Sequence, residues 1–284
     1  MNTPETLARG IAAVLDHPIA GAALRLTTCL LVLVFFQIGY RWGYTGHRGP
    51  GVFDATLALD QMLPLVPQFI VFYMFGYVFV LVPCLAVRQR HDFYAATVSF
   101  CMMLGVAFLM FHFMPVHMQK TMPLGDAWYA RWTRFQQNVD TYYNNFPSLH
   151  VALNVFAYSL LARQARRLSW WWLPVPVLVI VSTLLVKQHL VLDVIGGIVL
   201  AAAGLVFFRF LRTRSPSIVL GAFAVCFSSL LFLLLSHLER LQMTWRKIIR
   251  FVDAGGAAAE VVGAGLVALL LIAWLSGRSA RQID

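Results

Sequence analysis

The chain has 284 residues, of which 60% are hydrophobic and 12% are charged, and its mean hydropathy is +0.74. A soluble domain cannot bury this much apolar surface, so the composition excludes a water-soluble protein and predicts an integral membrane protein. The net charge of +10 does not indicate a nucleic-acid partner, because the basic residues lie in short segments between apolar runs instead of on one soluble face.

Apolar runs long enough to cross a bilayer, which takes about 20 residues each, recur along the chain. They predict an all-α, polytopic membrane helical bundle of about eight transmembrane helices. The expected spans are residues 22–40, 66–87, 94–114, 148–162, 171–187, 190–208, 217–236 and 257–275. We see no internal repeat or separate soluble domain, so residues 1–284 are expected to form a single membrane domain.

The start of the chain and the four cysteines carry little functional signal. The first 21 residues lack the basic-then-apolar order of a cleaved signal, so the first span is expected to remain as an anchor. Cys29, Cys84, Cys101 and Cys226 lie separately in apolar runs. Without paired spacing they do not suggest a disulfide framework or a zinc site, and we interpret them as packing residues.

Arginines cluster at one side of the membrane if the predicted spans alternate in direction. The clusters fall at residues 88–90, 163–167, 209–214 and 278–281. By the positive-inside rule that side is cytoplasmic. The expected outer segments are residues 41–65, 115–145 and 187–189. A further outer segment, residues 237–253, has apolar residues at helical spacing among basic ones and predicts a helix lying in the interface.

The sequence "KQHLVLD" contains a candidate catalytic pair. His189 and Asp193 are four residues apart, so on a helix both side chains would share one face within hydrogen-bonding range. A carboxylate can keep one ring nitrogen protonated and leave the other free as a nucleophile or base. A structural pair that joins two helices or caps the sixth span is the alternative, and this pair alone leaves both interpretations open.

The sequence "YYNNFPSLH" contains the second candidate. Pro147 suits the first turn of a helix, and Ser148 would place its hydroxyl beside the free N–H groups of a helix start, which favours an anion. Helix capping alone would explain both residues. It does not explain His150, whose imidazole could act as a general acid beside a bound phosphate. One pair of spans returns the two motifs to the same membrane face.

Together, "FPSLH" and "STLLVKQHLVLD" resemble the second and third signature motifs of the type 2 phosphatidic acid phosphatase (PAP2) superfamily, Pro-Ser-Gly-His and Ser-Arg-x5-His-x3-Asp. The resemblance covers residues 22–210 and implies a six-helix catalytic core. Residues 211–284 would then form an additional transmembrane hairpin with the interfacial helix. The resemblance also implies that His189 attacks phosphorus to form a phosphohistidine, that Asp193 orients it, and that His150 protonates the leaving oxygen, with no metal or cofactor.

The same resemblance implies a set of substrate-binding residues. Ser148 and nearby backbone amides would hold phosphate oxygens, and the neighbouring Asn145 is a further candidate. Thr183 stands where the third motif usually has Arg, and Leu149 stands where the second has Gly.

The first family motif, Lys-x6-Arg-Pro, is absent, because the seventh residue after Lys120 is Ala127. Lys120 and Lys187 are candidates for the positive charge on the phosphoryl oxygens. Alternatively, each lysine extends toward lipid headgroups at the membrane edge.

Other polar residues are less informative. Asp60 and Tyr73, near the start of the second span, are candidates for lining a substrate route, and Asp140 and Asn144 for contacting a headgroup. They also fit an ordinary helix start and a polar, aromatic outer loop.

The combination of "FPSLH" and "KQHLVLD", without the motif arginine, resembles the branch of the superfamily that includes inositol phosphorylceramide synthase and sphingomyelin synthase. These relatives transfer the phosphoryl headgroup to a lipid hydroxyl instead of to water. The motifs fix the donor half of the reaction and leave the acceptor open, and we predict hydrolysis of a lipid phosphate or diphosphate at the outer membrane face. The alternatives are transfer to a lipid hydroxyl such as that of ceramide or diacylglycerol, and non-catalytic lipid binding or transport. The expected partners are the bilayer and its lipids, not nucleic acid, and the expected location is a bacterial plasma (inner) membrane with an extracytoplasmic site.

Overall fold

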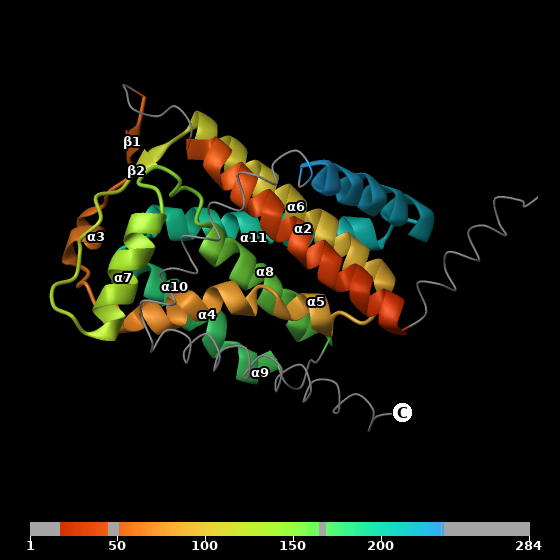
Figure 1. Cartoon of the computed structure of the whole chain (residues 1–284), viewed down its shortest axis with the longest axis horizontal. Coiled ribbons are helices and arrows are strands. Elements are labelled where there is room, and N and C mark those ends of the chain that lie inside the picture. The colour runs from red at the N-terminus through yellow and green to blue at the C-terminus, as the bar shows by residue number, and fades with distance from the viewer. Residues whose placement is uncertain (1–17, 45–50, 165–168, 234, 236–284) are drawn as a thin grey trace, which may run out of the picture.

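A computed structural model describes residues 18–44, 51–164, 169–233 and 235 of the chain, which form a bundle of helices (Figure 1). Five described helices are long and apolar enough to cross a membrane. The predicted all-α polytopic bundle is therefore confirmed. The expected interfacial helix at 237–253 and the last expected span at 257–275 lie outside the described residues.

Six helical segments of the bundle correspond to the predicted core. They are α2 (Pro18–Tyr44), α4 (Ile70–Phe79) continued by α5 (Val82–Ala86), α6 (Arg90–Phe113), α8 (Leu149–Gln164), α9 (Ser169–Trp172) continued by α10 (Pro174–Leu185), and α11 (Val191–Arg212). A further helix follows over Pro216–Leu233. The span expected at 94–114 begins earlier, at Arg90, because Asp92 in its first turn bonds to Arg212 Nε at 2.6 Å and so ties α6 to α11.

One end of the bundle is covered by the segments that join the spans. These are β1 (Phe53–Asp54), α3 (Ala58–Met62), the short 3-10 helix η1 (Pro67–Phe69), β2 (Val116–His117) and α7 (Trp128–Val139). Figure 1 shows β1, β2, α3 and α7 gathered at the left end. The strands pair in parallel, with Phe53 opposite Val116 and Asp54 opposite His117. A bridge from Val116 to Asn144 brings in the chain just before α8.

At the opposite end, α2 is attached to the turn between α5 and α6. Arg25 donates from Nη1 to Cys84 O at 3.0 Å and from Nη2 to Arg88 O at 3.0 Å. Cys29 on α2 and Cys84 on α5 form a disulfide. The interpretation of these two cysteines as separate packing residues is therefore wrong. Residues 55 apart in sequence become neighbours because α2 packs against α5, and no spacing rule within one apolar run reveals that contact.

The helices α8 and α11 approach closely at the covered end. A Cβ atom on Gly197 would lie 2.6 Å from Ser148 O and 3.0 Å from the Val151 Cβ. Ser148 N donates to Asp193 O at 3.0 Å across the same junction. Position 197 therefore has room only for glycine. The close approach joins the starts of α8 and α11, the two helices that follow the sequence motifs.

Replacing Gly197 with Ala should destabilise the protein by about 1–3 kcal/mol, because the added methyl group overlaps the Ser148 carbonyl. Thermal unfolding in detergent measures the effect. Gly105→Ala is the matched control, since no described atom lies within 4 Å of its added Cβ and alanine favours the helix. Equal melting temperatures for the two variants would contradict the close-packing account.

Candidate active site

The start of α8 is a capped helix end. Ser148 lies directly before α8, and its Oγ accepts the N–H of Val151 at 3.3 Å, which is the bond of an N-cap. Pro147 precedes this cap and is joined to Phe146 by a cis peptide bond. The prediction that Pro147 occupies the first helical turn is wrong, since the helix begins two residues later. The Ser148 side chain is buried and bonded within its own helix end.

The start of α11 differs from the sequence expectation. Leu190 is the N-cap, and Asp193 Oδ2 accepts its N–H at 2.8 Å. His189 therefore precedes the helix, after a turn in which Lys187 has φ 53°. The prediction that His189 and Asp193 share one face of a helix is wrong, because the helix begins between them.

His189 and Asp193 nevertheless lie against each other. The distance from His189 Nδ1 to Asp193 Oδ2 is 3.6 Å, an ion-pair contact somewhat longer than the hydrogen bond expected from the sequence. Asp193 is fully buried and His189 is 8% exposed. Among the described residues, neither His189 Nδ1 nor Asp193 Oδ1 has a hydrogen-bond partner.

The turn that carries His189 is fixed by the end of α10. The carbonyl of Thr183 accepts the N–H of Gln188 at 3.0 Å and that of His189 at 3.2 Å. The Thr183 hydroxyl donates to Ile180 O at 2.7 Å. Thr183 thus holds the histidine turn through its backbone, and its buried side chain is directed into its own helix.

His150, in the first turn of α8, is held by α4. Its Nε2 lies 2.7 Å from Tyr73 O, and because a carbonyl only accepts, this ring nitrogen carries the proton. The imidazole stacks on the Tyr73 ring at 4.1 Å and meets the edge of Tyr77 at 4.7 Å. A Cβ atom on Gly76 would lie 2.4 Å from His150 Nε2, so only glycine leaves room for the ring.

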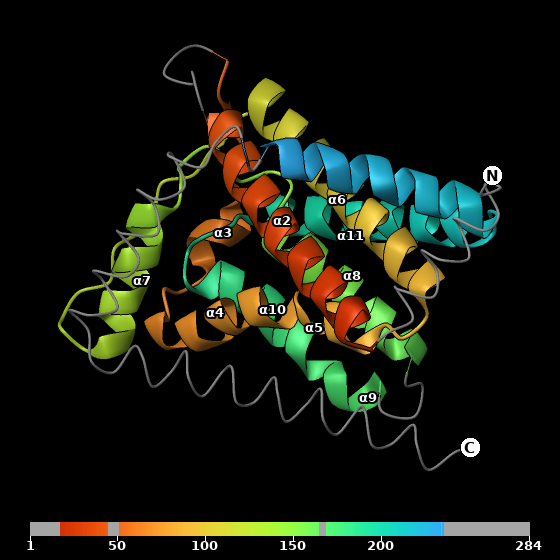
Figure 2. The same ribbon diagram turned by 45° about the vertical axis from the view of Figure 1, so that its right-hand side comes forward.

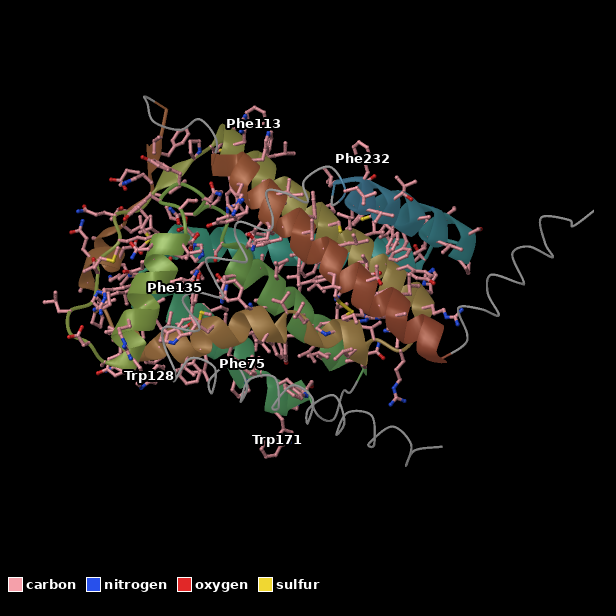
Figure 3. All side chains as sticks on the ribbon, in the orientation of Figure 1. Phe75, Phe113, Trp128, Phe135, Trp171 and Phe232 are labelled. Atoms are coloured by element: carbon pink, nitrogen blue, oxygen red, sulfur yellow. A yellow bond between two sulfur atoms is a disulfide. The ribbon has the colours of Figure 1, made fainter. Side chains whose placement is uncertain are left out.

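A cavity of about 530 Å³ extends from the two histidines into the bundle. Figure 2 shows α2 passing in front of α8, beside α4 and α5, and residues of all four helices line the cavity. Phe135 on α7, labelled in Figure 3, contributes to its wall. The polar residues at the histidine end are Gln37, Tyr40, Arg41, Tyr73, Tyr77, Gln136, Asp140, Thr141, Asn144, His150, Asn154 and His189. The rest of the wall is mainly apolar, so the cavity offers a polar end and an apolar interior.

Two of the predicted phosphate-binding residues, Lys120 and Asn145, do not line the cavity and contact other protein groups instead. Lys120 Nζ lies 3.4 Å from Gln137 O and 3.9 Å from Asp140 Oδ2. Asn145 Nδ2 donates to Val116 O at 2.9 Å and to Tyr142 O at 2.8 Å. Both side chains hold together the segments that cover this end of the bundle.

Lys187 and Asp60 join α3 to the start of α11. Lys187 Nζ donates to Asp60 O at 2.8 Å. The Asp60 carboxylate accepts the N–H of Leu57 and, with its second oxygen, that of Val191, both at 2.8 Å. Asp60 is therefore a cap for two helices. Tyr73, by contrast, does line the cavity.

The structure thus brings together His150, His189 and Asp193, of which the two histidines line the cavity. The set lining the polar end also contains residues that the sequence analysis did not select, including Tyr40, Tyr77, Gln136 and Asn154. For Asn154 a signal existed, because a residue four positions after His150 shares its helix face. Within the described ranges, no group of three or more His, Cys, Asp or Glu side chains is arranged to hold a metal ion.

Burial lowers the pKa of the Lys120 ammonium, and the nearby Asp140 acts in the opposite direction. The unfolded chain retains this proton up to about pH 10.4, whereas the folded chain releases it at lower pH. Between the two pKa values the unfolded state binds more protons, so the free energy of unfolding rises with pH.

Lys120→Met should flatten this rise, because the titrating ammonium is removed. Melting temperatures between about pH 8 and about pH 10 check the slope. Lys187→Met is the comparison, since this more exposed ammonium should contribute less. A slope that Lys120→Met leaves unchanged would assign the pH dependence to another group.

Comparisons with known proteins give one match. Neither a curated protein nor a solved structure matches the chain. The sequence profile of the PAP2 superfamily matches residues 52–207, which is more than half of the chain and runs from β1 to near the end of α11. The matched region contains both histidine motifs and the turn between α10 and α11. The chain is therefore an integral membrane protein that belongs to the PAP2 superfamily, a family of phosphatases and phosphotransferases.

Proposed function

We propose that the protein is a membrane lipid phosphatase that cleaves a lipid phosphate or diphosphate through a phosphohistidine intermediate on His189. The observation that carries the proposal is that His150 and His189 line the same cavity, with Asp193 Oδ2 3.6 Å from His189 Nδ1. A nucleophile, its orienting carboxylate and a second imidazole are the groups that such a reaction requires.

The chemistry follows from the two ring environments. His189 Nδ1 faces Asp193, so a proton held there leaves the Nε2 lone pair to attack phosphorus. The bond from phosphorus to the leaving oxygen breaks, and that oxygen takes a proton from His150. Because the His150 Nε2–H is bonded to Tyr73 O, the acid form of His150 is the imidazolium, which carries a second proton on Nδ1, and Nδ1 supplies that proton. Water then attacks phosphorus and gives a proton to His150 Nδ1, and the bond from phosphorus to His189 Nε2 breaks, which releases phosphate and restores both histidines.

The charge distribution supports an extracytoplasmic site. Arg88, Arg90, Arg163, Arg212 and Arg214 lie at the end of the bundle opposite the motif histidines. By the positive-inside rule the arginine end faces the cytoplasm. The substrate headgroup would then be presented at the outer face, in a bacterial plasma membrane under this proposal, while the apolar part of the cavity suits lipid chains.

Arg41 is the proposed cation for the phosphoryl oxygens. It lies in the last turn of α2 and lines the cavity, whereas Lys120 and Lys187 do not. An arginine presents several donors in a fixed plane and matches phosphate oxygens well. It would take the place of the motif arginine that Thr183 replaces.

His189→Ala should abolish turnover, and Asp193→Asn should lower kcat by at least about 100-fold, because the imidazole loses the charge that orients and stabilises it. Arg41→Gln should lower kcat/KM while leaving the fold intact. The measurement is release of phosphate from a lipid monophosphate by purified protein in detergent. Asn138→Ala, at an exposed position on α7, is the control. Turnover that survives His189→Ala would rule out the phosphohistidine, whereas no turnover by the unaltered protein would favour a non-catalytic role.

Transfer to a lipid hydroxyl is the second candidate. The cavity continues past the histidines along α2 and α5 as far as Pro83, Cys84 and Val87, an apolar stretch that suits the chain of an acceptor lipid. This extension supports a branch of the family that uses a lipid acceptor.

Radiolabelled lipid phosphate or diphosphate distinguishes the two reactions. Free phosphate released without a second lipid is the result expected of a phosphatase. Product that forms only after ceramide or diacylglycerol is added would favour transfer to a lipid hydroxyl over hydrolysis.

A further inference from the structure

Two buried asparagines place unpaired acceptors at the polar end of the cavity. Asn144 is 2% exposed and Asn154 is fully buried, and both line the cavity. Among the described residues, Asn144 Oδ1 and Asn154 Oδ1 have no hydrogen-bond partner. Since a buried carbonyl without a partner is costly, each oxygen indicates a missing donor.

The orientation of both amides is fixed by neighbouring carbonyls. Asn144 Nδ2 donates to Tyr40 O at 2.6 Å, and Asn154 Nδ2 donates to His150 O at 2.7 Å. A carbonyl can bond only to the NH2 side of an amide, so neither amide can be turned around without loss. The unpaired atoms are therefore acceptors and not donors.

Asp140 extends this acceptor wall. It lines the cavity, and its Oδ1 accepts the Tyr40 hydroxyl and the Thr141 N–H. Its Oδ2 lies 3.9 Å from Lys120 Nζ, beyond hydrogen-bond range. An ionised phosphate has only acceptor oxygens, so it cannot bond to this wall.

The acceptor wall, defined as Asp140, Asn144 and Asn154, lines the same cavity as His150. Asn154 follows His150 by one helical turn, and Gly76 would contact both side chains if it carried a Cβ atom. Tyr77 meets the edge of the His150 ring and accepts a hydrogen bond from Gln136 at 3.0 Å. A group bound to the wall would therefore lie beside the proposed reaction centre.

We propose that the acceptor wall binds the hydroxyl groups of a reactant other than the phosphate itself, an assignment that rests on the proposed function. Hydroxyl groups can donate to all three acceptors. A cationic amine fits less well, because Lys120 already lies beside Asp140 and would repel it. The hydroxyls belong either to a polyol headgroup of the phospholipid substrate or to a lipid alcohol that accepts the phosphoryl group.

Binding to the full chain carrying His189→Ala tests this inference, because the lipid is retained without turnover. Native mass spectrometry in detergent compares phosphatidylinositol with phosphatidylmethanol of the same tails, and ceramide with its O-methylated form. Hydroxyl-bearing lipids should bind more tightly by about fivefold for each hydrogen bond gained. A preference within the phosphoinositide pair assigns the wall to the headgroup, and one within the ceramide pair assigns it to the acceptor.

Adding Asn144→Ala or Asn154→Ala should remove the preference, whereas Asn138→Ala should preserve it. The comparison of matched lipids needs no asparagine variant, so a variant that fails to fold does not prevent the test. Equal binding within both pairs, a preference that both asparagine variants retain, or tighter binding of phosphatidylethanolamine than of phosphatidylinositol would overturn the assignment. Failure of the phosphohistidine proposal would appear separately, as turnover that survives His189→Ala in the catalytic assay.

Discussion

The arrangement of the site depends on the junction between the starts of α8 and α11. Ser148 N donates to Asp193 O at 3.0 Å, and Gly197 lets the two backbones approach this closely. Each helix start also contains its own cap, from the Ser148 hydroxyl and the Asp193 carboxylate. Because backbone groups within a membrane protein must be satisfied internally, these bonds hold the chain on both sides of the site. The positions of His150 and His189 follow from them.

Hydropathy was sufficient to predict the bundle and the meeting of the two motifs at one end of it. Apolar runs of the right length predict spans, and alternation of the spans brings residues 150 and 189 to one membrane face. The grouping of His150, His189 and Asp193 followed from this topology together with the family motifs. The exact helix starts did not, because Leu190 takes an extended conformation that places His189 outside α11.

The polar residues next to the motifs were harder to assign, because their partners are distant in sequence. Lys187 bonds to the Asp60 carbonyl, Lys120 lies beside Asp140, and Asn145 bonds to Val116 and Tyr142. A single sequence shows that a lysine is near the membrane edge, but it does not show which carbonyl the lysine will reach. The Cys29–Cys84 disulfide depends on the same kind of long-range contact between helices. Motif spacing therefore predicted which histidines and which aspartate lie together, but it did not predict the contacts that support them.

The contacts of Asp60 change the significance of the segment before α4. Loops outside a membrane ordinarily tolerate insertions and cleavage because few contacts hold them. Here one carboxylate oxygen caps α3 and the other bonds to the first amide of α11, two residues after His189. The segment is thus a mechanical support for the histidine turn. Sequence changes near residue 60 should therefore displace the turn that carries His189, although the two positions are separated by more than a hundred residues of chain.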